Sequence, residues 1–386
     1  MSKGAIIRAD SGCEDYTMQI FELNADVLDA ILSWFGKRTL VQFMSTCRDA
    51  HEAGFPHLVT SVDLHHSMKQ VFDFAHFMLL EKHRHKTLKV LRSLHLYGGA
   101  SAIGIHQKHP RVVAGLDAFA TLLEQVHNLK TLRIMDVALL FSLNPRICQA
   151  IAQNPSLTSI SLTAADKYNT LAFDMIPRIQ GLRHIHVSHE RDLIPVIRPF
   201  QLTLETLSSE YRFFRNHSDL LSLTDVDVWP QVHTLNLGLL TVKTHRLVHA
   251  FPNLRRLRLQ SVVRSPLPTD TAACICWPSL DYVEVSISGL QELRLRCPIR
   301  ELHLSIPPDM NFWQHDNWLA TLLQCLRTAL PSALSFPVMA NVRDDTLFTQ
   351  LALQLPSLKV LGLSFVYDPV ATLQRLVRAY TLTHAP

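Results

Sequence analysis

One pattern of aliphatic positions recurs along most of the chain. It consists of an aliphatic residue, two variable residues, a second aliphatic residue, one variable residue and a third aliphatic residue. The alternation at the end of each copy predicts a short strand with one buried face. The clear copies begin at Leu91, Leu129, Leu157, Leu182, Val232, Leu254, Leu280, Leu290, Ile299 and Leu358, and weaker ones lie near Leu204 and at Ala333.

The segments between most copies predict helices. Before the copy at Leu129, the apolar residues Leu116, Phe119 and Leu123 recur at helical spacing. A proline stands two residues before several copies, and proline is disfavoured inside a helix, so it marks the helix end. Those copies are the ones at Leu157, Leu254, Leu280 and Leu358. The repeating unit is therefore predicted to be a helix, a loop and a short strand.

Units of this kind placed side by side predict a parallel-sheet solenoid. The repeat resembles the leucine-rich repeat, in which a buried Asn or Cys follows the last aliphatic residue. Here the corresponding positions hold other residues, such as Val137 and Val262, so no Asn ladder is expected. The copies at Leu280, Leu290 and Ile299 follow too closely for helices, which predicts strands joined by tight loops there. The predicted fold class is α/β, an irregular solenoid with a parallel-sheet arc and helices on its convex side.

The N-terminal part breaks this pattern and predicts short helices. A first helix is expected between Asn24, as its N-cap, and Gly36, as its end. A second is expected from Thr39 to about Ala53. So few helices cannot bury all of their apolar side chains among themselves, and this excess predicts a partner.

This helical segment resembles an F-box. That family has Leu-Pro, an acidic residue, paired aliphatic residues and later a Cys followed by a basic residue. Asn24 replaces the usual Pro, and Ala50 stands where Trp is usual. The resemblance implies docking on a Skp-type adaptor, and through it on a cullin-RING ubiquitin ligase. The implied adaptor contacts are Leu23, Asp26, Val27, Leu28, Ile31, Leu32, Phe35, Leu40 and Cys47.

An F-box followed by leucine-rich repeats is a familiar family arrangement, and it implies that the repeats select a protein substrate while the chain itself does no chemistry. The expected organisation is a flexible N-terminus over 1–18, an F-box-like segment over 19–60, a linker helix and turn over 61–87, and the solenoid over 88–386.

Polar residues between the core aliphatics predict a solvent-facing side of the strands. This side is either an ordinary soluble surface or a substrate-binding face. Several arginines would converge there, and Arg suits carboxylate or phosphate, so an acidic or phosphorylated substrate is expected. The candidate substrate contacts are Arg133, His184, His186, Arg256, Arg258, Tyr282, Arg294, Arg296 and His303.

Composition narrows the partners. The chain has 37 Lys plus Arg and 33 Asp plus Glu, a net charge of +4 that gives no indication of a nucleic-acid or membrane partner. Its seven cysteines form no CxxC pair and indicate reduced thiols, so a cytoplasmic or nuclear protein is expected. No apolar run approaches the roughly 20 residues of a membrane span.

Catalytic and metal motifs are weak, and no cofactor is expected. His184, His186 and His189 with Glu190 could bind a metal, but a solvated strand and loop is the simpler interpretation.

Two other hypotheses remain open. One is a leucine-rich-repeat interaction scaffold whose N-terminal helices only cap the repeats. The other is an α/β enzyme, against which the short strand spacings argue.

Overall fold

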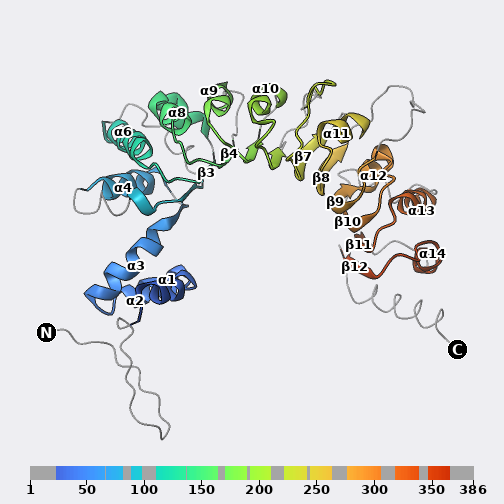
Figure 1. The fold of residues 1–386 in the computed structure, drawn as a ribbon, viewed down its shortest axis with the longest axis horizontal. Coiled ribbons are helices and arrows are strands. Elements are labelled where there is room, and N and C mark those ends of the chain that lie inside the picture. The colour runs from blue at the N-terminus through green and yellow to red at the C-terminus, as the bar shows by residue number, and fades with distance from the viewer. Residues whose placement is uncertain are drawn as a thin grey trace, which may run out of the picture. The chain divides into compact units, whose positions relative to one another are not determined.

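The computed structural model describes residues 23–65, 67–80, 88–97, 110–135, 137–163, 170–188, 192–209, 221–240, 244–262, 276–305, 318–338 and 347–365. The stretch expected to be a flexible N-terminus, 1–18, lies outside these ranges. The chain divides into two compact units, Met1–Gly181 and Leu182–Pro386. Both units are α/β, and the twelve strands of the described residues are drawn with their helices in Figure 1.

In the described part of the first unit, three helices precede the first strand, and strands β1 to β4 pair in parallel in chain order. Its elements are α1 (Ala25–Ser33), α2 (Lys37–Met44), α3 (Arg48–Thr60), β1 (Ser61–Leu64), α4 (Met68–Leu79), β2 (Ser93–Leu96), α6 (Pro110–Gln125), β3 (Thr131–Met135), α7 (Val137–Leu143), α8 (Pro145–Ala152), β4 (Ser159–Thr163), α9 (Thr170–Met175) and the 3-10 helix η3 (Ile176–Arg178).

In the second unit, strands β5 to β12 also pair in parallel and in chain order. Its elements are β5 (His184–Ser188), α10 (Ile194–Ile197), the 3-10 helix η4 (Arg198–Phe200), β6 (Thr206–Ser209), β7 (Thr234–Leu240), α11 (Thr244–Ala250), β8 (Arg256–Val262), β9 (Leu280–Ser286), α12 (Ile287–Leu293), β10 (Ile299–Ser305), α13 (Trp318–Ala329), β11 (Ala333–Val338), α14 (Leu347–Gln354) and β12 (Val360–Phe365).

The alternation along most of the described strands separates a buried face from a polar one. In β3, for example, Leu132 and Ile134 are buried, whereas Thr131 and Arg133 are partly exposed. In each unit the helices that alternate with the strands lie on one side of them (Figure 1). The prediction of a solenoid-like α/β fold with parallel strands is confirmed at this level. The two weaker copies of the pattern are also strands, namely β6 and β11.

A repeated backbone junction ties seven of the described strands to their predecessors and sets the register there. We call it the strand-start pair, because the N–H groups of two successive residues at the start of one strand donate to a single carbonyl of the preceding one. The donors and acceptors are Lys130 and Thr131 to Arg92, Thr158 and Ser159 to Lys130, Glu205 and Thr206 to Arg183, His233 and Thr234 to Glu205, Arg255 and Arg256 to His233, Asp281 and Tyr282 to Arg255, and Lys359 and Val360 to Ser332.

Side chains reinforce these junctions at a position the sequence analysis did not consider. Three residues before the first aliphatic position of a copy, an N–H-bearing side chain donates to a carbonyl of the preceding repeat. Asn154 donates to Val126 O at 2.6 Å. Trp229 and Trp277 do so through Nε1, to Ile197 O at 3.2 Å and to Phe251 O at 2.7 Å. These inter-repeat donors supply side-chain bonds between repeats without an Asn ladder after the strand.

The expected strand at Leu290 is wrong, because residues 287–293 form helix α12. Ile287, Leu290 and Leu293 are all buried, a spacing of three that places them on one side of a helix. The hydroxyl of Ser286 caps this helix by accepting from the N–H of Gly289 at 3.1 Å. Arg294 ends it in a left-handed conformation with φ 48°. A helix of about two turns therefore fits where tight loops were expected.

The N-terminal boundaries also differ from expectation. The stretch 61–87, expected to be a linker helix and turn, contains helix α4 and also strand β1, which pairs with β2 from Ser61 onward, while residues 81–87 lie outside the described ranges. The second helix, expected from Thr39 to about Ala53, is two helices, α2 and α3. The helical conformation is interrupted at Cys47, whose backbone is extended. The Sγ atom of Cys47 accepts a hydrogen bond from the N–H of Ala50 at 3.4 Å, so Cys47 is the N-cap of α3.

Helices α4 and α6 pack closely at Gly115. A Cβ placed there would lie 2.2 Å from Cγ of Phe72. Helix propensity alone would favour Gly115→Ala by about 1 kcal/mol, whereas overpacking costs about 1–3 kcal/mol. We expect Gly115→Ala to lower the free energy of unfolding in urea. Val113→Ala, on the exposed side of the same helix, should change it by less than about 0.5 kcal/mol. A stabilised Gly115→Ala protein would show that Phe72 moves aside without cost.

Candidate functional site

The N-terminal helices share a small core of their own. Leu32, Leu40 and Met44 are buried in it, and Leu28 and Phe35 pack against it among other partly buried side chains. The carboxamide of Asn24 accepts from the N–H of Asp26 at 3.0 Å and starts α1, which confirms its expected role as N-cap. Leu32 and Leu40, both expected to contact an adaptor, are therefore core residues of this segment and leave almost no surface for a partner.

The outer side of α1 carries apolar side chains that no described element covers. Val27, Ile31 and Trp34 follow helical spacing and so lie on one side of this helix. Val27 is 46% exposed and Trp34 is 89% exposed, while Ile31 is partly exposed. We call these three residues the α1 stripe. The family pattern did not point to Trp34, although its spacing from Val27 and Ile31 could have identified it.

The remaining expected adaptor contacts differ in accessibility. Asp26 is exposed, and Leu23 and Cys47 are partly exposed. Val41, on α2, is a further exposed apolar residue at 51%. The helices therefore present an apolar surface with polar neighbours, and their buried core does not depend on it.

A polar network links α2 to the first two strands. Asp63 forms an ion pair with Lys37 of α2 and accepts from Nδ1 of His95 at 2.8 Å. Nε2 of His95 lies 3.0 Å from the hydroxyl of Ser93. The hydrogen bond from Lys37, helped by the charges of Lys37 and His95, outweighs burial and lowers the pKa of Asp63. The helical segment is thereby braced against the start of the sheet.

The contacts of Ser93, His95 and Asp63 have the connectivity of a nucleophile, a base and an orienting acid. In this chain, Lys37 occupies the other oxygen of the same carboxylate. The imidazole and the carboxylate both lie partly exposed on the polar side of the strands. We therefore interpret the arrangement as the brace described above.

Next to this brace, Arg133 lies over an aromatic pair. Its Cζ is 5.3 Å from the centroid of the Tyr97 ring, and the ring of His65 stacks on Tyr97 at 4.4 Å. In the parallel register, Arg133 lies between His95 on β2 and Ser161 on β4. Nε of Arg133 is buried and has no hydrogen-bond partner among the described residues.

On the polar side of the second unit, the expected substrate contacts form a mixed-charge cluster. Arg258 binds Glu284 at 3.0 Å, and the hydroxyl of Tyr282 donates to the same carboxylate at 2.8 Å. The ring of His303 lies 5.0 Å from that of Tyr282. Burial first, and the neighbouring Glu284 second, raise the pKa of Tyr282 to about 12, so its hydroxyl remains a donor. The charge of Arg258 is thus already matched.

Two of the expected arginines do not belong to this face. Arg294 caps the end of α12 and Arg296 lies in the following loop, because the segment forms a helix in place of a strand. Arg256 is exposed on β8, next to Tyr282 in the register. The structure therefore does not place Arg294 and Arg296 on the strands beside Arg256 and Arg258, as the sequence analysis expected.

The two candidate histidines of β5 make different contacts. Nδ1 of His186 lies 2.8 Å from the hydroxyl of Ser208 on β6. Nε2 of His184 is 3.9 Å from Glu205, too far for a hydrogen bond. Within the described ranges, no group of three His, Cys, Asp or Glu side chains could hold a metal ion. The other two residues of the metal alternative, His189 and Glu190, lie outside those ranges.

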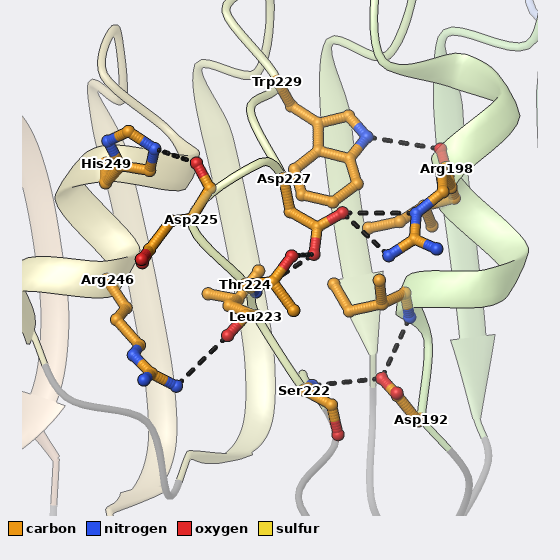
Figure 2. Close-up of polar contacts among 12 residues, drawn as sticks. Asp192, Arg198, Ser222, Leu223, Thr224, Asp225, Asp227, Trp229, Arg246 and His249 are labelled. Atoms are coloured by element: carbon orange, nitrogen blue, oxygen red, sulfur yellow. Dashed lines mark hydrogen bonds and ion pairs between the residues drawn. The ribbon is translucent and has the colours of Figure 1, made fainter.

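The connection between β6 and β7 contains a buried carboxylate whose contacts are all structural. Asp227 accepts from Nη2 and Nε of Arg198 at 2.9 and 3.2 Å, and from the N–H of Thr224 at 3.0 Å (Figure 2). The hydroxyl of Thr224 donates to it as well. Asp192 joins the same segment by accepting from the N–H groups of Ile194 and Ser222. These contacts stabilise an irregular connection at a point where other strands are connected by a helix.

Burial raises the pKa of several of the described thiols. All the described cysteines are free. Burial raises the pKa of Cys148 and of Cys297 to about 11, which disfavours the thiolate at neutral pH.

Among the described helices, none combines the length and the apolar character that a membrane crossing needs.

No family model matches the chain, and the search of curated proteins gives no match. The F-box and leucine-rich-repeat resemblances therefore remain predictions that rest on the residues quoted above.

Proposed function

We propose that this protein is a non-catalytic substrate-recognition subunit of an SCF-type ubiquitin ligase. In this proposal, α1 and its neighbours bind a Skp-type adaptor, and the polar side of the strands binds a protein substrate. The chain would act by effective concentration, because it would hold a substrate lysine near the ubiquitin-conjugating enzyme carried by the cullin-RING assembly.

The observation that carries the proposal is the exposure of the α1 stripe. Large apolar side chains are enriched at the centres of protein interfaces, and Trp is prominent among those that dominate binding energy. Trp34 is exposed, whereas Leu32, two positions earlier and on the other side of the helix, is buried. The helical segment therefore has both a stable core and an apolar surface that is suited to a partner helix or groove.

The alternative is a repeat scaffold in which the N-terminal helices only cap the sheet. The contact of Lys37 with Asp63 and the direct run of α3 into β1 favour close attachment of the helices to the repeats. A cap, however, would bury its apolar stripe against the first repeat. The exposed α1 stripe favours the adaptor proposal over a cap alone.

We expect Trp34→Ala to weaken binding of a purified Skp-type adaptor by about 30-fold, since a central Trp contributes about 2 kcal/mol or more to an interface. Val27→Glu should weaken it further, because a charge would enter an apolar contact. Affinity can be measured by calorimetry with the full chain. Leu28 is less suitable for this test because it packs against the buried cluster.

The matched control is Leu202→Ala, since Leu202 is 80% exposed in the second unit and should leave adaptor binding unchanged. Circular dichroism should show that every variant is folded. Failure of the folded wild-type chain to bind the adaptor would overturn the proposal and favour the scaffold. Equal binding by wild type and by Trp34→Ala would exclude the α1 stripe as the contact.

A further inference from the structure

We infer that the polar side of β1–β4 in the first unit anchors a phosphorylated side chain of the protein substrate, with Arg133 as its main contact. This inference rests on the proposed function for the identity of the ligand as a substrate. The site consists of Arg133, Tyr97 and the hydroxyl-bearing residues beside them on β3 and β4. We call it the Arg133 site.

Arg133 is held ready for an anion. The guanidinium lies against the Tyr97 ring at 5.3 Å, a cation–π distance, and Tyr97 is itself held by the stacked ring of His65. Holding a long side chain in one place before binding reduces the entropy lost when a ligand arrives. The contact with Tyr97 thus restrains the guanidinium of Arg133 before a ligand binds.

The charge of Arg133 is not matched within the part of the chain that the structure describes. No carboxylate forms an ion pair with it there, whereas Arg146, Arg183 and Arg258 each bind a glutamate. The acid nearest along the register row, Asp63, is already engaged by Lys37 and His95. Nε of Arg133 also lacks an acceptor. Because Nε itself is covered, an anion would match the charge of Arg133 through the terminal Nη groups of the guanidinium.

The neighbours of Arg133 suit a phosphate. Thr131 and Ser159 face each other across β3 and β4, and Ser161 lies beside Arg133 in the next row. All three are partly exposed on the polar side and carry hydroxyl donors. A phosphorylated side chain carries nearly two negative charges and three acceptor oxygens, so it can bind the Arg fork and hydroxyls together. A single carboxylate would use fewer of these donors.

The same comparison disfavours the second unit as the anchor. There Arg258 is bound to Glu284, and Glu301 lies in the row beside Tyr282. A phosphate would meet two carboxylates on neighbouring strands. The first unit, by contrast, offers Arg133, and the one acid that the described residues place in its register row, Asp63, is already paired with Lys37.

The experiment uses a degenerate peptide library with one fixed phosphoserine and matched libraries with Ser or Glu at that position. Retention on the immobilised full-length chain is measured for each library. We expect the phosphoserine library to be retained about tenfold more than the Ser library, the equivalent of about 1.4 kcal/mol. Arg133→Met should remove this preference, and Arg133→Lys should retain only part of it, because Lys lacks the planar fork.

The matched control is Arg256→Met, an exposed strand arginine of the second unit, which should keep the preference. Equal retention of phosphoserine and Ser libraries by wild type would overturn the inference. Equal retention of Glu and phosphoserine libraries would replace phosphate by a simple acidic ligand, and equal losses in both arginine variants would indicate only general charge attraction.

Adaptor binding separates this inference from the proposed function. Arg133→Met should still bind the Skp-type adaptor, because Arg133 is not part of the α1 stripe. An Arg133-dependent phosphopeptide preference in a chain that binds no adaptor would retain the Arg133 site and reject the ligase proposal.

Discussion

Replacing Asp227 by Ala is expected to lower the free energy of unfolding of the second unit by about 3 kcal/mol, at the lower end of the range for a broken buried ion pair. The side chain of Asp227 is fully buried, whereas that of Arg198 is 53% exposed. After the substitution, Arg198 can turn to water, which reduces the cost. The N–H and hydroxyl of Thr224 lose their acceptor, and this part of the cost remains.

The pH dependence of this effect follows from the direction of the pKa shift. Burial alone would raise the pKa of Asp227, but the hydrogen bonds from Thr224 and the bonds and charge of Arg198 outweigh burial and lower it. The folded pKa is thus below the unfolded value of about 3.9. The stabilisation is therefore complete above the unfolded pKa and is lost as the pH falls through the folded pKa.

Urea unfolding of wild type and Asp227→Ala at pH 7, 5, 4 and 3 tests both statements. The difference in unfolding free energy should be constant from pH 7 to 5 and should shrink below about pH 4. The control is Arg300→Ala, since Arg300 and Glu301 form an exposed pair whose loss should cost less than about 1 kcal/mol. A difference that grew in acid would show that Asp227 is protonated in the folded protein.

Replacing Trp277 by Ala is expected to lower the free energy of unfolding by about 3–5 kcal/mol, because it removes a large buried ring. Trp277 is 2% exposed. The ring also donates to Phe251 O at 2.7 Å and so joins two repeats. Trp277→Phe keeps most of the apolar volume but removes the donor, and it should cost about 1–3 kcal/mol.

Comparison of the two variants separates packing from the hydrogen bond. Far-ultraviolet circular dichroism, which does not depend on Trp fluorescence, gives the urea midpoint of each variant and so its loss of unfolding free energy. An unchanged midpoint for Trp277→Phe would mean that the carbonyl of Phe251 finds another donor. In that case, Trp277 would stabilise this junction through the packing of its ring and not through its hydrogen bond.

The aliphatic pattern was sufficient to predict most strands because alternating aliphatic residues mark the buried face of a strand. It failed at Leu290, where the spacing from Leu290 to Leu293 suits a helix as well as the pattern used for strands. The side-chain cap from the hydroxyl of Ser286 favours the helix there. The inter-repeat donors were also missed, because Asn154 and Trp277 are different residue types with one shared property, a side-chain N–H aimed at a neighbouring carbonyl.

The candidate surfaces were predictable as faces but not as individual contacts. Periodicity identified the helical segment, yet it could not tell Leu32, which is buried, from Val27, which is exposed, until the helices were packed together. On the strands, sequence alone could not reveal that Glu284 matches Arg258. The unmatched charge of Arg133 depends on contacts between strands, which only the register provides.

The strand-start pair has a mechanical consequence. Each pair joins one strand only to the strand before it, so a pulling force along the stack in the second unit passes through the junctions in series. Such a stack should yield one junction at a time, beginning at its weakest link. Trp229 and Trp277 each span one of these links and would make the middle of this unit resist extension longest.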